Sequence, residues 1–370
     1  MTWNWQHSDW PHFSWQADRL RRREDSFLRH AGVIIGSQSG LSAENGLQLA
    51  IELMGGEALD TSQIEGEMLD RHSIQASIRK HLGLTVDRRS GPTEAGIARM
   101  MVDLYKSLGK PLQESQLFQW HEMIMNGRWD LAGIGHYRAH DDVMEIVSGP
   151  VGRQRVHFVA PSSGGLPQEM HRLFDWLMQT SPDGPEPLPA VTRAGIAHLW
   201  FESLHPFEDG NGRLGRALVE NALAEGSERP VLTGVSSVFL KKRNEYYRAL
   251  GQANRTLQID AWLNWFADAV LEAQQRTLKQ VRFVIEKGRF LERYETLLNE
   301  RQRKAVLRML ETGVDGFEGG LSADNYRRIT GAPISTATRD LSALVELGAL
   351  RRTGEKKGTR YYLDLLRDQS

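Results

Sequence analysis

The chain has 370 residues, and its 46 lysines and arginines nearly balance its 47 aspartates and glutamates, for a formal net charge of −1. That length allows two or three domains with a sizeable core, and the balanced charge provides no global field to recruit nucleic acid or a membrane surface. The chain has no cysteine, which excludes disulfides, thiolate metal sites and cysteine nucleophiles. Neither a basic-then-apolar signal pattern nor an apolar run of membrane-spanning length occurs, so we expect a cytoplasmic protein without a membrane segment.

An arm rich in aromatic residues opens the chain, which includes Trp3, Trp5, Trp10, Phe13 and Trp15. Because each aromatic side chain buries a large area, we interpret the arm as packed onto a core rather than as a peptide-binding groove. Apolar residues at helical spacing then predict a helix over about 15–37 and another over about 43–54. We expect the second helix to end at Gly55-Gly56.

The segment 59–67, Leu-Asp-Thr-Ser-Gln-Ile-Glu-Gly-Glu, taken alone predicts an ordinary helix that Asp60 or Thr61 would cap. A helical pattern continues over 71–90 and ends in a polar, basic turn near 87–92. We place a domain boundary at this turn.

Two more helices are predicted, over about 93–108 and 114–125. His121 lies on the apolar stripe of the second one. A histidine in that position is typical of a core or boundary residue, so we do not interpret it as catalytic.

Two β-favouring runs, residues 143–147 and 155–159, flank a segment rich in turn formers at 148–152. We predict a β-hairpin in an otherwise helical context. Because a two-stranded hairpin has an exposed edge, it can pair with an extended peptide through its main chain. His157 lies on the second run, and we interpret it as a surface side chain of the hairpin.

The strongest chemical signal is the string His-Pro-Phe-Glu-Asp-Gly-Asn-Gly-Arg-Leu-Gly-Arg at residues 205–216. Glycines flanking an asparagine let backbone N–H groups form an anion-binding nest, and a helix beginning at the asparagine would add its dipole. Arg213 and Arg216, three residues apart, share one helix face and can bind phosphate oxygens. Asp209 is a hard oxygen ligand suited to Mg²⁺, and His205 can accept a proton near neutral pH. The pattern indicates a phosphate-binding site with a base beside it.

This string resembles the signature of the Fic family, His-x-Phe-x-Asp/Glu-Gly-Asn-Gly-Arg-x-x-Arg. All its specified positions are matched here, by His205, Phe207, Asp209, Gly210, Asn211, Gly212, Arg213 and Arg216. The resemblance implies a mainly α fold built on a Fic helical bundle, in which the predicted hairpin is a flap that positions a target segment over the active site. It also implies transfer of AMP from Mg·ATP to a Tyr, Thr or Ser hydroxyl of a protein.

The resemblance assigns roles to individual residues. His205 would be the general base, and Asp209 would hold Mg²⁺ against the phosphates. The residues expected to bind the nucleotide are Gly210, Asn211, Gly212, Arg213, Arg216, Tyr246, Tyr247 and Asn254. The Tyr-Tyr pair is similar to one that lines the adenine pocket of Fic proteins, although two tyrosines on an amphipathic helix equally suit a core.

Residues 61–66 resemble a second Fic element, Ser/Thr-x-x-x-Glu-Gly/Asn, which is autoinhibitory in the family. It stands upstream of the motif, as in the N-terminally inhibited members. The carboxylate of Glu65, delivered to Arg216, would occupy the fork that a terminal phosphate needs. Glu67, by contrast, is expected to face elsewhere on the helix.

The last 70 or so residues predict a separate unit. Helices over 300–311, 322–329 and 335–347 are followed by two short strands around the basic segment 354–358. This order resembles a winged helix-turn-helix, with Arg339 on the would-be recognition helix. Acidic neighbours dilute the charge, so DNA binding and protein contacts remain alternatives. The predicted domains are 1–91, the N-terminal helical segment with the arm and inhibitory motif; 92–298, the Fic domain; and 299–370, the winged helix.

The sequence therefore predicts an autoinhibited protein adenylyltransferase that uses ATP and Mg²⁺ and docks an unidentified protein target at the flap, near residues 143–159. Self-AMPylation and a homodimer are left open, as are the target and the modified residue type. One alternative is removal of AMP from a modified protein, alone or alongside AMPylation, with Glu65 positioning a water. The other is a nucleotide-sensing regulator whose winged helix binds DNA.

Overall fold

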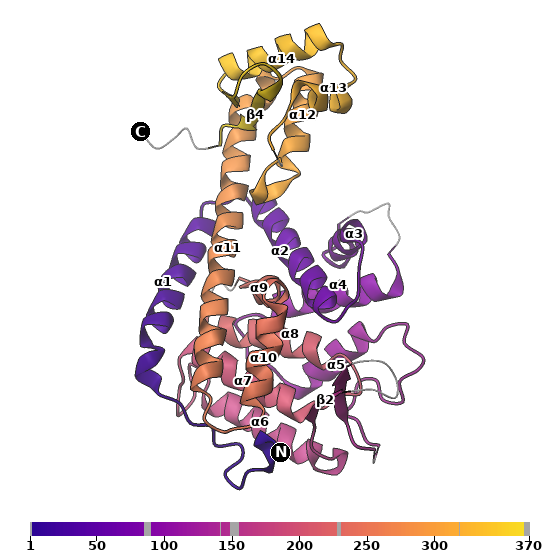
Figure 1. Cartoon of the computed structure of the whole chain (residues 1–370), viewed down its shortest axis with the longest axis vertical. Helices are drawn as coiled ribbons and strands as arrows, with labels where there is room; N and C mark the ends of the chain where they lie inside the picture. Colours follow the sequence, from indigo (N-terminus) through magenta and orange to yellow (C-terminus); the bar gives the residue numbers. More distant parts are fainter. Residues whose placement is uncertain are drawn as a thin grey trace. The chain divides into compact units, whose positions relative to one another are not determined.

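The structure, a computed structural model, describes residues 2–84, 90–140, 142–148, 155–227, 231–317 and 319–365. Across these ranges the fold is mainly α-helical, with fourteen α-helices and two antiparallel sheets of two strands each (Figure 1). The predicted fold class is thereby confirmed. Contacts divide the chain into two compact units: Met1–Gly36 with Ala50–Thr277, and Ser37–Leu49 with Leu278–Ser370. The predicted three domains stay a prediction, and residues 85–89 of the basic turn lie outside the described residues.

The helices and some of the strands can be followed by their labels in Figure 1. The α-helices are α1 (Arg21–Gln38), α2 (Ala43–Ile64), α3 (Arg71–His81), α4 (Pro92–Ser107), α5 (Glu114–Ile124), α6 (Leu166–Gln179), α7 (Ala190–Leu204), α8 (Asn211–Ala224), α9 (Val235–Lys241), α10 (Arg243–Ala253), α11 (Asp260–Tyr294), α12 (Glu300–Leu310), α13 (Ala323–Thr330) and α14 (Ile334–Glu346). The strands are β1 (Glu145–Ser148), β2 (Arg155–Val159), β3 (Leu350–Thr353) and β4 (Arg360–Leu363).

The aromatic arm packs onto the first unit, as the sequence predicted. The ring of Trp3 lies edge-on to that of Phe158, with centroids 5.1 Å apart. The indole N–H of Trp5 donates to the carbonyl of Val159 at 2.7 Å. These contacts bury aromatic area against β2, so the arm holds the flap strand from outside.

Helix α2 continues through Gly55-Gly56, so the predicted end there is wrong, as is the separate capped helix over 59–67. Gly55 lies against α3: a Cβ built on it would lie 3.4 Å from Cγ of Gln75 and 3.9 Å from Cδ1 of Ile78. Each glycine costs a helix about 1 kcal/mol. Close packing against α3 offsets that local preference, and one long helix results.

Helices α7 and α8 form the centre of the first unit. Every residue of α7 from Val191 to Leu204 is buried, which is typical of a helix that is covered on all sides. The surrounding core includes the rings of Phe239, Trp262 and Phe266. The loop 205–210 connects these two buried helices, so its ends are held by the core.

The predicted hairpin is confirmed in its strands. Residues Glu145 and Ile146 of β1 pair with Val159 and Phe158 of β2, and a bulge follows at Ile146/Val147. His157 is exposed, as expected for a surface side chain. Residues 149–152 of the predicted turn, 148–152, lie outside the described residues.

The second unit contains the predicted three helices and the β3–β4 hairpin, around a core of its own. Asp340 of α14 joins the helices, since it accepts hydrogen bonds from Nε of Arg301 at 2.9 Å and from the hydroxyl of Tyr326 at 3.0 Å. The element order agrees with the sequence, while its identification as a winged helix, and DNA binding, stay predictions. Among the described residues, no helix combines the length and the apolar character that a membrane crossing requires.

Candidate active site

His205 follows α7 in a strained backbone conformation. Its φ of 47° and ψ of 59° lie in the left-handed region, which costs a non-glycine residue about 1–2 kcal/mol. Its N–H donates to the carbonyl of Phe201 at 3.0 Å, and its carbonyl accepts from Nε of Arg138 at 2.9 Å. The buried Arg138 also donates to the carbonyl of Pro161. Arg138 therefore fixes the turn that presents the imidazole, a role that no local sequence signal indicated.

The imidazole of His205 is neutral at physiological pH. Desolvation, reinforced by the positive charge of Arg138, lowers its pKa to about 4. Among the described residues, its buried Nδ1 has no hydrogen-bond partner. A neutral imidazole has one nitrogen lone pair free to accept a proton, so the ring is in the protonation state that a general base requires.

Asn211 closes the loop that follows His205. The N–H of Phe207 donates to Oδ1 of Asn211 at 2.9 Å, and Nδ2 of Asn211 donates to the carbonyl of Phe207 at 2.8 Å. Gly210 caps α8 with a φ of 82°, a left-handed conformation that favours glycine, and a Cβ there would also displace the end of the Met125 side chain. The Asn211 side chain thus supports the loop. Because its amide group is used within the loop, only the backbone N–H of Asn211 could make the predicted contact with a nucleotide.

Asp209 is held ionised by two arginines. NH1 of Arg128 lies 2.5 Å from its Oδ2, and NH2 of Arg213 lies 3.7 Å from its Oδ1. Although desolvation opposes the shift, the Arg128 hydrogen bond and the Arg213 charge lower the pKa of Asp209. Asp130 in turn accepts from Nε and NH2 of Arg128, both at 2.7 Å. The sequence analysis missed Arg128, because its contact with Asp209 spans 81 positions of chain.

The residues of the loop fit a magnesium site that substrate phosphates would complete. Among the described residues, no three or more His, Cys, Asp or Glu side chains are grouped so that they could hold a metal. Asp209 offers an ionised oxygen ligand whose side chain keeps 40% of its surface exposed. Mg²⁺ is usually held by one or two carboxylates together with substrate phosphates, so a single accessible carboxylate beside the N-terminus of α8 is compatible with the ion.

Arg216 is buried and paired with the end of α2. Its NH2 donates to Oε1 of Glu65 at 2.6 Å, and its Nε donates to Oγ1 of Thr61 at 2.7 Å. A Cβ at Gly212 would collide with the Glu65 carboxylate, so this carboxylate lies over the first turn of α8. The N-terminal turn of a helix is where an anion is favoured. The structure thus brings Glu65 and Arg216 together, as the sequence predicted.

Arg213 has a carboxylate partner that the sequence analysis excluded. Its NH1 donates to both oxygens of Glu67, at 2.8 and 3.0 Å. The expectation that Glu67 faces elsewhere on a helix is wrong, because α2 ends at Ile64 and Gly66 takes a φ of 89°. The chain turns there and returns Glu67 to α8.

The three other predicted nucleotide-binding residues differ in exposure. Tyr246 is 1% exposed, and its hydroxyl shares a 2.9 Å hydrogen bond with Nε2 of the buried His198. Asn254 is buried, and its Oδ1 accepts from the hydroxyl of Ser203 at 3.2 Å. Tyr247 is 43% exposed. Tyr246 and Asn254 are therefore built into the core, Tyr247 presents an accessible ring, and their binding roles stay predictions.

His121 supports the loop from behind. Its ring stacks on Phe207 with centroids 4.1 Å apart. Its Nδ1 accepts the N–H of Gly135 at 3.0 Å, so Nε2 carries the proton that faces the carbonyl of Asp209 at 3.3 Å. The predicted core position is confirmed, and the contact with the loop is a supporting role that the apolar stripe did not reveal.

Glu202 is a buried acid one helical turn before His205 that the sequence analysis did not single out. Burial raises the pKa of its carboxyl to about 8, against the opposing charge of Arg216. A Cβ at Gly215 would collide with its Oε1. The folded protein therefore keeps Glu202 protonated at neutral pH, packed directly against α8.

Glu202→Gln is expected to gain stability relative to the wild type as the pH rises. Glutamate in an unfolded chain titrates near pH 4.3, whereas folded Glu202 has a pKa of about 8. Because the folded state binds the proton more tightly, this group stabilises the fold below about pH 4 and loses that contribution as the pH rises toward 8. Glutamine does not titrate. Scanning fluorimetry should show the melting temperature of the variant, minus that of the wild type, increasing from about pH 5 to 8; a constant difference would contradict the buried acid.

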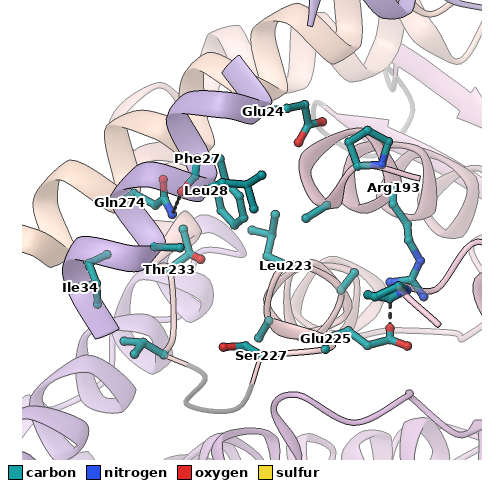
Figure 2. Close-up of a pocket in the computed structure, with 18 of the residues that line it drawn as sticks. Glu24, Phe27, Leu28, Ile34, Arg193, Leu223, Glu225, Ser227, Thr233 and Gln274 are labelled. Carbon is teal, nitrogen blue, oxygen red and sulfur yellow. Dashed lines mark hydrogen bonds and ion pairs between the residues drawn. The ribbon is translucent and has the colours of Figure 1, made fainter. Parts of the chain in front are cut away.

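A cavity of about 540 Å³ lies beside α1, the start of α7 and the end of α8 (Figure 2). Its walls include the apolar side chains of Phe27, Leu28 and Leu223, and NH1 of Arg193 pairs with Oε2 of Glu225 at 2.8 Å on one side. None of the motif residues lines it. Because His205, Asp209 and the N-terminus of α8 are absent from its walls, the candidate active site is the motif and not this cavity.

Comparison with protein families identifies two segments of the chain. A model described as Fic/DOC family matches residues 111–223, and one described as a domain of unknown function (DUF4172) matches residues 3–84. Curated relatives named protein adenylyltransferase Fic include one from Nematostella vectensis, 33% identical over 96 residues, which are 26% of this chain and 21% of that protein. One from Drosophila yakuba is 29% identical over 192 residues, 48% of this chain and 37% of that protein. The chain therefore spans well under half the length of these relatives.

Solved structures show the same fold. A Fic family protein from Desulfovibrio desulfuricans G20 matches with a TM-score of 0.53 and 23% identity, over 92% of this chain and 95% of that one. A Fic domain containing signaling protein from Bacteroides thetaiotaomicron VPI-5482 matches with a TM-score of 0.52 and 19% identity, over 70% of this chain and 97% of that one. The segment that matches the Fic/DOC family model contains the complete motif, and these solved Fic structures are similar to this chain in fold.

Proposed function

We propose that the protein is an adenylyltransferase that moves AMP from ATP to a hydroxyl side chain of a protein. The observation that carries the proposal is the single turn between α7 and α8, which holds a neutral His205 and an ionised Asp209 beside the N-terminus of α8. Base, metal ligand and phosphate-binding helix end are what nucleotidyl transfer needs in one place. The curated relatives that bear the name adenylyltransferase support the same chemistry.

In the proposed reaction, His205 accepts the proton of the target hydroxyl as its oxygen attacks the α-phosphorus of ATP. The new oxygen–phosphorus bond forms while the bond to the bridging oxygen breaks, and pyrophosphate leaves. Arg213 and Arg216 bind the outer phosphates and keep the leaving group in line with the nucleophile. Backbone N–H groups at the start of α8 stabilise the charge on the phosphates. Mg²⁺ at Asp209 would neutralise phosphate charge.

The resting site is proposed to be autoinhibited by Glu65. Its Oε1 accepts a hydrogen bond from NH2 of Arg216 at 2.6 Å, and the carboxylate lies over the first turn of α8. A terminal phosphate would need the same guanidinium and the same helix end. ATP would then bind only in a pose that turns its α-phosphate from the nucleophile.

The β1–β2 flap is the proposed docking site of the target protein. In the described part of the chain its sheet has two strands, so each strand has one edge without a neighbouring strand. Main-chain pairing on such an edge gives affinity for an extended segment, and side-chain pockets add specificity. Val143 and Val156, at 69% and 41% exposed, offer apolar contacts for that segment.

Incubating the full chain and its Glu65→Gly variant with ATP radiolabelled at the α or the γ position tests the proposal. We expect protein-bound label only from the α position, since AMP retains that phosphorus. Label from the γ position would indicate phosphoryl transfer instead. If neither position labels protein with either variant, in the presence of a cell extract as a source of targets, the proposed transferase activity is contradicted. Loss of AMP from a previously labelled protein would favour the reverse reaction.

A further inference from the structure

The end of α2 is a turn that requires an unusual backbone at Gly66. The N–H of Gly66 donates to the carbonyl of Gln63 at 3.1 Å, and the N–H of Glu67 donates to the carbonyl of Ser62 at 3.0 Å. This pair of bonds is the Schellman motif, in which the residue after the cap is left-handed. Gly66 has a φ of 89°, and a Cβ built on it would meet nothing within 4 Å, so the backbone alone requires glycine.

This turn presents two carboxylates to one helix. Glu65 and Glu67 lie on either side of Gly66, and each contacts a different arginine of α8. Oε1 of Glu65 lies 2.6 Å from NH2 of Arg216, and Oε2 of Glu67 lies 2.8 Å from NH1 of Arg213. If the helix had continued past residue 64, Glu65 and Glu67 would point in different directions around its axis. The turn at Gly66 instead lets both carboxylates face α8.

The two ion pairs are alike in burial. The side chains of Arg213 and Arg216 are 3% and 1% exposed, while those of Glu67 and Glu65 are 32% and 31% exposed. A buried guanidinium is costly unless it is paired. Glu65 is the carboxylate partner of Arg216, and Glu67 lies closer to Arg213 than Asp209, whose Oδ1 is 3.7 Å from NH2. Nε of Arg213 is buried and has no hydrogen-bond partner among the described residues, so Glu67 leaves part of the donor set of Arg213 unused.

We propose that Glu67 is a second inhibitory carboxylate, which withholds Arg213 from the nucleotide as Glu65 withholds Arg216. The inference rests on the proposed function, because it takes both arginines to be ligands of the outer phosphates. In this proposal Glu67 determines nucleotide specificity. While carboxylates occupy both guanidinium groups, the resting site binds the β- and γ-phosphates of ATP poorly, but its affinity for adenosine and the α-phosphate is unaffected.

Glu67→Gln tests this directly, since it keeps the length of the side chain and removes its charge. The variant is compared with the parent in a His205→Ala background, which allows calorimetric titration of the full chain with Mg·ATP and with AMP without turnover. We expect affinity for ATP to rise about tenfold, the effect of one charge-assisted hydrogen bond made available to a phosphate. Affinity for AMP should stay unchanged.

Glu44→Gln is the matched control, because it removes the same charge from an exposed position of α2, the helix that precedes the Gly66 turn. It should change neither affinity. Equal ATP affinity for Glu67→Gln and its parent would overturn the inference, as would an equal gain for ATP and AMP, which would mean a general opening of the site. If Glu65→Gly gains ATP affinity and Glu67→Gln does not, only the second carboxylate is contradicted; if no variant binds ATP, the proposed function fails with it.

Substitutions at Gly66 give an independent measurement that leaves both acids in place. Alanine is strained at this φ, whereas asparagine tolerates the left-handed region and occurs at such caps. Gly66→Ala should therefore loosen both ion pairs and raise ATP affinity, while Gly66→Asn should titrate like its parent. The melting temperature of each variant should be measured to check that the fold is kept. Equal ATP affinities for the alanine and asparagine variants would contradict the role of the turn.

Discussion

Replacing His205 with alanine is expected to lower AMP transfer by roughly 10²–10⁴-fold, the usual contribution of a general base, while nucleotide binding is retained. The rate is best measured as α-label incorporation in a Glu65→Gly background, where the uninhibited site gives a high reference rate. The imidazole, whose pKa desolvation lowers to about 4, is neutral across the physiological range and can take the hydroxyl proton. Asp209 and the N-terminus of α8 remain in place to bind the phosphates.

Two further variants separate chemistry from folding at this position. Because the backbone of His205 is left-handed, with a φ of 47°, alanine adds strain, whereas asparagine tolerates that region better. His205→Asn should lose transfer to the same extent and keep the melting temperature closer to that of the parent. His171→Ala removes an exposed histidine of α6, with a side chain 78% exposed, and should label normally. Full labelling by either His205 variant would remove this residue from the mechanism.

Glu65→Gly is expected to raise self-AMPylation, or labelling of an added target, by at least about tenfold, equivalent to some 1.4 kcal/mol of barrier. The carboxylate lies 2.6 Å from NH2 of the buried Arg216, and its removal frees that guanidinium for a terminal phosphate. Neither His205 nor Asp209 is altered. Rates are compared at matched ATP and Mg²⁺ concentrations.

A second substitution identifies the group that Glu65 restrains. Adding Arg216→Ala to Glu65→Gly should abolish the gain, because the freed guanidinium is what positions the nucleotide. Glu44→Gln, on an exposed part of the same helix, should label at the wild-type rate. Equal labelling by the wild type and Glu65→Gly would sink the autoinhibition proposal and leave residues 61–66 as the structural end of α2.

Local sequence was sufficient for the elements that carry the chemistry. Gly210 marks the start of α8, because its φ of 82° is a left-handed cap conformation that favours glycine. The two β-favouring runs at 143–147 and 155–159 located both strands of the flap. These signals succeed because capping and strand preference depend on neighbours within a few positions.

The helix propensity of individual residues gave a wrong end for α2, because packing against α3 outweighs it. Gly55-Gly56 predicted a helix end, yet α2 passes through both, since Gly55 lets α3 approach closely at Gln75. The end of α2 then lies nine residues or so later, at Ile64, and the turn at Gly66 redirects Glu67. The prediction for Glu67 assumed that residue 67 is helical, whereas α2 ends at Ile64.

The motif by itself determined which residues could form a phosphate-binding site with a base, because residue types and spacing carry that chemistry. Only the tertiary structure decided what each charged group contacts. Arg216 meets Glu65 across 151 positions, Arg213 meets Glu67 across 146, and Asp209 meets Arg128 across 81. No local pattern encodes such pairs, because they arise from how the buried helices pack. A guanidinium that is buried away from water is costly unless a carboxylate pairs with it, so the fold must also supply that partner.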